Sequence, residues 1–230
     1  MAKEVVSAAS LKRRLKGADL ADREALYLRL HRSISWIRSS EQLESIDLQF
    51  ISLWIAFNSL YADSAVITGP SPEFKREKEI YSNFINKVDA LNNKGDFYQF
   101  VWARFSSEVK SIIQNKFLNS NYWIALNSGT SFNESKMEVQ FVKAFNYLKN
   151  QEAAPVISMI LDNLYVLRNQ LMHGYATHGS MVNRKQIRHG ITFLQNLNTI
   201  IVLTMIEHPD EAWGGVNYPV IDKDKFFKEK

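Results

Sequence analysis

Hydrophobic residues recur every three or four positions along most of the chain, which is the spacing of one face of an α-helix. In residues 43–62, for example, Ile46, Phe50, Leu53 and Phe57 follow this spacing. The same pattern predicts helices at residues 21–38, 43–62, 73–91, 97–117, 134–150, 155–173 and 184–207. No segment of useful length alternates apolar and polar residues as a half-buried strand would. The sequence therefore predicts an all-α, up-and-down bundle of about seven helices.

The predicted helices differ in how much apolar surface they carry, and breaker residues separate them. Residues 43–62 also place Ile51 and Trp54 off the main stripe, so this helix is expected to be central. The Gly- and Pro-containing stretch 65–72 predicts a loop, and Pro209 ends the last helix. We expect three parts: a basic N-terminal segment at 1–18, one helical domain at 19–208, and a peripheral tail at 209–230.

Composition narrows the class of protein. A chain of 230 residues buries a substantial core without a second domain, and 46% hydrophobic with 23% charged residues is typical of soluble proteins. There are no cysteines, which excludes disulfides and thiolate-bound zinc or iron–sulfur sites. Residues 1–6 lack a secretory apolar core, and apolar runs such as 199–206 are too short to span a bilayer. We expect a soluble, cytoplasmic protein that does not contact a membrane.

The net charge of +4 is unevenly distributed. Residues 1–38 contain nine Lys or Arg against four Asp or Glu. Residues 163–206 contain no acidic residue, and their basic residues are Arg168, Arg184, Lys185 and Arg188, with three histidines. One interpretation is that this region attracts a polyanion such as RNA. The alternative interpretation is a solvated basic face that binds nothing.

The candidate chemistry lies where the helix 155–173 ends. On an ideal helix, Asn169 and His173 are neighbours on the face opposite the apolar stripe, together with Asp162. Arg168 lies on the flank, about 140° around the helix axis from His173. The Arg and His side chains therefore meet only if the helix unwinds before Gly174 or if two copies of this face meet across a dimer axis.

A purely structural interpretation of His173 also stands, since a cationic residue before a helix-ending glycine is ordinary. The Arg-x4-His spacing is not specific by itself, because Arg184 and His189 repeat it in the next predicted helix.

Two segments together resemble the HEPN superfamily (higher eukaryotes and prokaryotes nucleotide-binding). The first is Arg168-Asn169-Gln170-Leu171-Met172-His173-Gly174, which is similar to the superfamily signature of an Arg, a polar residue and a His near a helix end. The second, residues 53–61, resembles the Trp-x-Ala-Phe-Asn-x-Leu-Tyr helix of larger bacterial members such as the Apea-like group. The resemblance covers the helices around 43–62 and 155–207, and residues 63–150 are expected to be a family-specific elaboration.

The resemblance implies a helical bundle that dimerises through the signature face. Many such proteins are metal-independent endoribonucleases, often the toxin of a toxin–antitoxin or phage-defence system with a nucleotidyltransferase-type or other antitoxin. Others are non-catalytic helical dimers that bind a nucleotide, RNA or a protein partner. Both functions remain open at the level of sequence.

The residue types suit cleavage of single-stranded RNA without a metal or cofactor. Neutral His173 can accept the ribose 2′-OH proton, and its cationic form can protonate the leaving 5′-oxygen. Arg168 can stabilise charge on the phosphorus, and Asn169 can orient His173 or the phosphate by hydrogen bonding. The products would be a 2′,3′-cyclic phosphate and a 5′-OH end. Asn58 is interpreted either as a satisfied buried amide or as a support for Arg168.

Further residues receive weaker assignments. Contacts to RNA are predicted for Arg184, Lys185 and Arg188, and His178 is expected to be a solvated loop residue. Core positions are predicted for Trp36, Trp54, Trp102 and Trp123.

Overall fold

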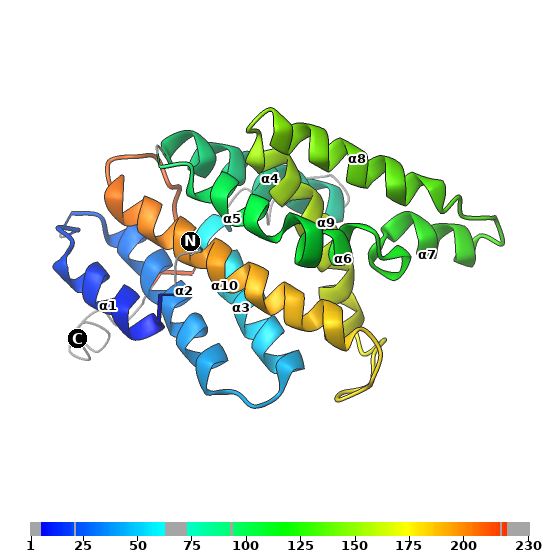
Figure 1. Cartoon of the computed structure of the whole chain (residues 1–230). Helices are drawn as coiled ribbons and strands as arrows, with labels where there is room; N and C mark the ends of the chain where they lie inside the picture. The colour runs from blue at the N-terminus through cyan, green and yellow to red at the C-terminus, as the bar shows by residue number, and fades with distance from the viewer. Residues whose placement is uncertain (1–5, 21, 63–72, 93, 217, 220–230) are drawn as a thin grey trace.

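The computed structural model describes residues 6–20, 22–62, 73–92, 94–216 and 218–219, and in these residues the secondary structure is helical, without strands (Figure 1). The all-α prediction is confirmed. The α-helices are α1 (Ala8–Gly17), α2 (Glu24–Gln42), α3 (Ile46–Tyr61), α4 (Glu73–Leu91), α5 (Asp96–Arg104), α6 (Lys110–Ile113), α7 (Ser120–Asn127), α8 (Ser135–Lys149), α9 (Ala153–Met172) and α10 (Arg184–Glu207). The predicted loop at 65–72 lies outside the described residues.

The predicted segment 97–117 is not one continuous helix. A π-helical turn at Phe105–Val109 joins α5 to α6, and a 3₁₀ turn at Lys116–Leu118 leads into α7. Asn115 and Asn119 cap these short pieces, because their side chains accept backbone N–H bonds from Phe117 and Asn121. Hydrophobic spacing survives such a break, so periodicity alone does not reveal it.

Helix α1 was not predicted, because its four basic residues dominate the composition of that segment. Its Leu11 and Leu15 are nevertheless buried in the same core as the rest of the chain, and so is Trp213 from the segment after α10. The described parts of 1–18 and 209–230 therefore pack against the helical domain.

Helix α3 is the centre of this core, as its apolar character on all sides predicts. It packs against α2 on one side and α10 on another. Phe50, Trp54 and Phe57 are buried, and the Trp54 ring meets the Tyr165 ring of α9 edge-on, with 6.0 Å between centroids. Asn198 of α10 is buried and donates its amide N–H to the Leu53 carbonyl oxygen at 2.9 Å. This bond joins α3 to α10 inside the core.

Helix α10 crosses the molecule in front of α3 (Figure 1), and Gly190 lies at the crossing. A Cβ at Gly190 would lie 2.8 Å from Cε2 of Phe50 and 3.1 Å from Cδ2 of Leu164. The absence of a side chain therefore lets α3, α9 and α10 approach one another at one point. Among the described helices, α10 alone has the length and apolar composition to cross a membrane, but 61% of that stretch is buried, as expected of a core helix.

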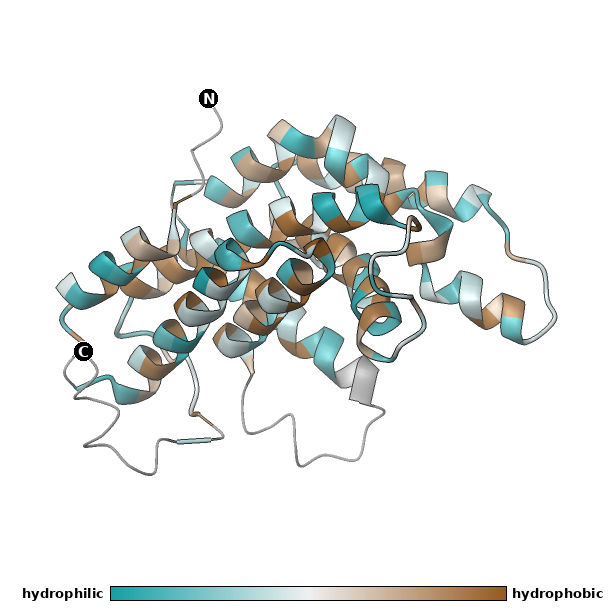
Figure 2. Ribbon diagram, turned by 90° about the horizontal axis from the view of Figure 1, so that it is seen from below, coloured by the Kyte–Doolittle hydropathy of each residue, from teal (hydrophilic) through white to brown (hydrophobic). Residues whose placement is uncertain are grey.

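Brown, hydrophobic positions in Figure 2 lie mainly where helices face one another, and teal positions lie mainly outside. Helix α7 and the adjoining part of α8 extend away from the rest of the bundle (Figure 1). The tryptophan predictions are only partly right: Trp54 is core, but Trp36 and Trp102 are 40% and 47% exposed. Trp123 is half-buried on α7.

Candidate functional site

Helix α9 remains helical up to its end, so it does not unwind to bring Arg168 to His173. His173 is the C-cap, and its backbone N–H donates to the Asn169 carbonyl oxygen at 3.0 Å. Gly174 follows with φ of +71°, a left-handed conformation that glycine adopts without strain. The Ala176 N–H then donates to the Gln170 carbonyl oxygen at 2.9 Å, which closes the helix end.

The structure brings Arg168 and Asn169 together. The Arg168 Nη1 donates to Oδ1 of Asn169 at 2.9 Å, and the guanidinium carbon lies 5.6 Å from the centroid of the Tyr165 ring. The contact with Tyr165, three residues earlier, follows from the lean of helical side chains toward the N-terminus of their helix. Within the described part of the chain this is the hydrogen bond that Arg168 makes, which leaves further guanidinium donors for a ligand.

His173 lies apart from this pair. Its side chain is exposed, and its ring centroid is 6.0 Å from that of Tyr175, which is also exposed. A single copy of the chain thus presents Arg168 with Asn169 on one side of the helix end and His173 with Tyr175 beyond it.

The face of α9 that Asp162 shares with Asn169 and His173 is partly covered by α4. Asp162 on that face accepts hydrogen bonds from Tyr81 and Lys78 of α4, which covers it. Asp162 and Asn169 are half-buried, and His173 at the end of the helix is exposed.

A cluster of hydroxyl and carboxyl groups lies beside Arg168. The Tyr61 hydroxyl of α3 donates to Oε1 of Glu77 at 2.8 Å and also lies 3.0 Å from Oδ1 of Asn58. Burial raises the pKa of Tyr61 well above its usual value, and Glu77 raises it further, while Arg168 opposes this. The pKa of Tyr165 is raised for the same reasons, so both tyrosines remain neutral donors.

Asn58 is half-buried, and its Oδ1 lies within hydrogen-bond distance of the Tyr61 hydroxyl. Its direct partner is Tyr61, and any support to Arg168 passes through this cluster.

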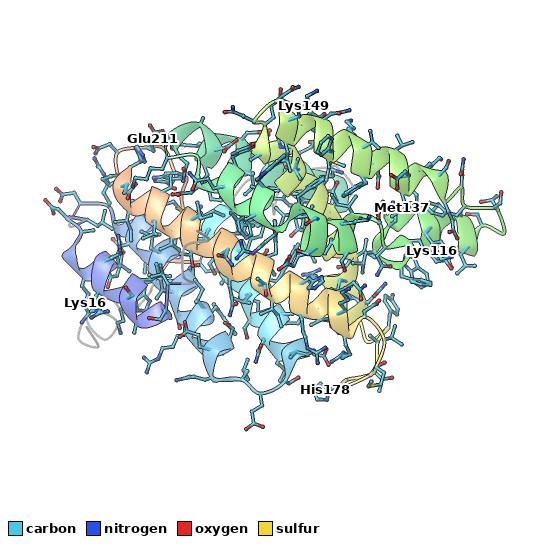
Figure 3. All side chains as sticks on the ribbon, in the orientation of Figure 1. Lys16, Lys116, Met137, Lys149, His178 and Glu211 are labelled. Atoms are coloured by element: carbon cyan, nitrogen blue, oxygen red, sulfur yellow. The ribbon has the colours of Figure 1, made fainter. Side chains whose placement is uncertain are left out.

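The loop between α9 and α10 is fastened to the start of α3. Arg184 and Asp47 form an ion pair at 2.6 Å, and the Gly179 N–H donates to the other Asp47 oxygen at 2.9 Å. The side chains of Arg184 and Asp47 are 14% and 6% exposed. Burial alone would raise the pKa of Asp47, but the bonds from Arg184 and Gly179 lower it below its usual value. Exposed His178, at the outer edge of the loop (Figure 3), bonds the Ser45 hydroxyl through Nε2 at 2.9 Å.

Among the predicted RNA contacts, Arg184 thus has its charge engaged by Asp47, whereas Lys185 and Arg188 are exposed. His189 lies half-buried in α10, and its pKa is lowered, first by burial and then by Lys185, against the opposing effect of Glu108. In the second Arg-x4-His pair, Arg184 is therefore engaged in an ion pair with Asp47, and His189 is a partly buried imidazole.

A groove of about 910 Å³ opens beside the end of α9, between this helix and α7. We call it the α7–α9 groove. Its wall includes Asn169 and Gln170 of α9, together with the aromatic side chains of Phe117, Trp123 and Tyr175. Asn169, which bonds Arg168, and Tyr175, which neighbours His173, therefore connect the groove to both candidate catalytic side chains.

Sequence reasoning missed this groove. Phe117, Trp123 and Tyr175 lie on three different segments, and only the fold of residues 105–128 against α9 assembles them. The sequence features that relate to the groove are Gln170, which lies inside the signature, and Asn115 and Asn119, which cap the short elements before and at the start of α7.

Within the described residues, no three histidine, aspartate or glutamate side chains gather as they would around a metal ion. No protein-family model, curated protein or solved structure matches this chain.

Proposed function

We propose that this protein is a metal-independent endoribonuclease of the HEPN superfamily that cleaves single-stranded RNA in the cytoplasm. The observation that carries the proposal is the bonded pair Arg168–Asn169 at the edge of the α7–α9 groove, with His173 exposed one turn further on. The lining of the groove, among the described residues, contains aromatic and amide side chains and no carboxylate. A phosphate is therefore not repelled there.

The proposed reaction is an attack of the ribose 2′-oxygen on the adjacent phosphorus. Neutral His173 removes the 2′-OH proton, and a protonated imidazole gives a proton to the leaving 5′-oxygen. Arg168, oriented by Asn169, stabilises the additional negative charge on the phosphate oxygens. The products are a 2′,3′-cyclic phosphate and a 5′-OH end.

A homodimer brings an Arg168 and a His173 side chain into one site, which a single copy does not do. Arg168 and His173 are not in contact within the chain, and the accessible end of the α9 polar face is where a second copy can bring its own His173. Each site then combines the Arg168 of one copy with the His173 of the other. A toxin or phage-defence effector of this kind would be controlled by an antitoxin, of the nucleotidyltransferase type or another, that covers this face.

The same separation of Arg168 from His173 favours the second candidate function, a non-catalytic HEPN-like dimer that binds a nucleotide, RNA or a protein partner. Such a protein would use the groove and the basic residues of α10 for binding alone.

The test is incubation of single-stranded RNA with the purified chain in EDTA, followed by analysis of the product ends. We expect cyclic phosphates, and we expect Arg168→Ala and His173→Ala each to slow cleavage by roughly 10²–10⁴-fold, the usual worth of an acid–base group or a preorganised charge. Circular dichroism should be unchanged, because neither side chain lies in the core.

Two control variants match these changes in type. His178→Ala removes an exposed histidine and should cleave at close to the wild-type rate, whereas Arg188→Ala removes an exposed arginine from the predicted RNA contacts and should weaken RNA binding at most. Absence of any cleavage by the wild-type chain, with RNA still bound, would establish the binding function in place of the catalytic one.

A further inference from the structure

One chain of hydrogen bonds forms the wall of the α7–α9 groove. The carbonyl oxygen of Phe117 accepts both the Trp123 indole N–H at 2.9 Å and the Gln170 amide N–H at 3.0 Å. Oε1 of Gln170 accepts from the Asn183 amide at 3.2 Å. The aromatic turn before α7 is therefore attached to the residue that directly follows Asn169.

The aromatic rings of this wall are open to solvent. Tyr175 is 80% exposed and Phe117 is 43% exposed, while Trp123 is half-buried with its ring centroid 6.4 Å from that of Phe117. The Lys116 ammonium, on the outer side of the segment between α6 and α7 in Figure 3, lies 5.6 Å from the Phe117 ring. Proteins stack unpaired nucleobases on exposed aromatic rings that lie beside cationic side chains.

We propose that the α7–α9 groove binds an unpaired base of RNA next to the phosphate that Arg168 and His173 contact. Its volume of about 910 Å³ is sufficient for a nucleotide. The amides of Asn127, Gln170 and Asn183 at the lining provide both donors and acceptors, which match the edge of a base. This inference rests on the proposed function, since the scissile phosphate fixes where the base lies.

The neighbouring surface offers a path for the rest of the strand. Phe117 and Asn183 also line a second hollow of about 1020 Å³, which contains Lys110, Lys116 and Lys185 together with Glu134 and Glu138. Lys116 in that hollow is paired with Glu134 at 2.5 Å, so contacts with phosphates fall to the other two lysines.

The occupant is an RNA base rather than a peptide because of what surrounds the groove. Arg168, with further guanidinium donors available, is bonded to Asn169 at the lining of the groove, and Lys185 lines the adjoining hollow. A nucleotide combines an aromatic ring with a negative charge and satisfies both features.

The experiment measures the binding of a fluorescent single-stranded oligonucleotide whose 2′-hydroxyls are methylated, so that it cannot be cleaved through 2′-attack. We expect Trp123→Ala and Tyr175→Ala each to weaken binding by roughly tenfold, the usual loss for one stacking contact. Trp102→Ala is the matched control, since Trp102 is an exposed aromatic residue of α5 that does not line the groove, and its binding should equal that of the wild type. The same strand annealed to its complement should bind less tightly, because its bases are paired.

Tyr175→Ala keeps the test meaningful if removal of Trp123 unfolds α7, because the Tyr175 side chain lies in solvent. Equal binding by the wild type and Tyr175→Ala would overturn the inference, as would an equal loss in Trp102→Ala. Absence of any binding by the wild type would overturn it too and leave the groove to a protein partner. Binding that depends on Tyr175 in a chain that cuts no RNA would support the base site and reject only the nuclease.

Discussion

Arg168 and His173 differ in how firmly the fold holds them. Arg168 is half-buried, bonded to Asn169 and placed over the Tyr165 ring, which itself lies beside the Tyr61–Glu77 cluster. His173 is exposed at the last position of α9, and its ring has Tyr175 as its neighbour. Arg168 is therefore preorganised by its own chain, whereas the final position of His173 depends on what binds to the end of α9.

The Asp47–Arg184 ion pair gives the chain a measurable dependence on pH. The folded pKa of Asp47 is lowered below its usual value of 3.8, so the pair stabilises the fold above that pH and loses this effect as the pH falls through the folded pKa. Asp47→Asn leaves Arg184 without its partner in a largely buried place. We expect the free energy of unfolding to fall by about 3 kcal/mol at pH 7.

The measurement is urea denaturation of wild type and Asp47→Asn from pH 7 down to pH 3. The difference between them should start to shrink below about pH 4, where Asp47 of the unfolded chain takes up a proton, and should disappear as the pH falls through the lower pKa of folded Asp47. Asp210→Asn is the control, since the Arg23–Asp210 pair is exposed and should contribute little at any pH. A difference that stays constant over this range would contradict the assignment.

At the scale of helices, the crossing of α3, α9 and α10 depends on Gly190. Gly190→Ala places a methyl group 2.8 Å from the Phe50 ring, and the buried ring has little space to withdraw. We expect a loss of about 1–3 kcal/mol in the free energy of unfolding, although alanine is the better helix former.

Gly17→Ala is the matched comparison. Gly17 ends α1, and a methyl group there would meet no other atom within 4 Å, so the substitution should leave stability unchanged or raise it slightly. Thermal denaturation of both variants distinguishes the two sites, and equal midpoints would show that the crossing tolerates a side chain.

At the scale of the whole molecule, the separation of Arg168 from His173 predicts a site shared between two copies. Light scattering should show a dimer at tens of micromolar. Mixing Arg168→Ala with His173→Ala after joint refolding should restore cleavage, because in a mixed dimer one of the two shared sites has both an intact Arg168 and an intact His173.

The expected recovery is about a quarter of the wild-type rate, since about half of the dimers are mixed and each has one complete site out of two. Each variant refolded alone serves as the control and should stay inactive. An active species that remains monomeric would reject the shared site.

The sequence by itself determined the long amphipathic helices and the direction of their apolar faces, whereas α1, α7 and the break within 97–117 were not predicted. The limits of α4 and α10 agree with the predicted 73–91 and 184–207, because an amphipathic stripe and flanking breakers are local properties. The central place of α3 also followed, since a helix that is apolar on all sides needs neighbours all around it.

Only the tertiary structure decided which polar faces are open. Asp162 and Asn169 share a face of α9, yet α4 covers the first and leaves the second beside a groove. Arg184 was indistinguishable from Lys185 as a basic residue until Asp47, distant in sequence, engaged it. The Phe117–Trp123–Tyr175 wall likewise exists because a broken helix folds back on α9. Contacts between distant segments depend on packing in three dimensions, and the periodicity of a single segment contains no information about them.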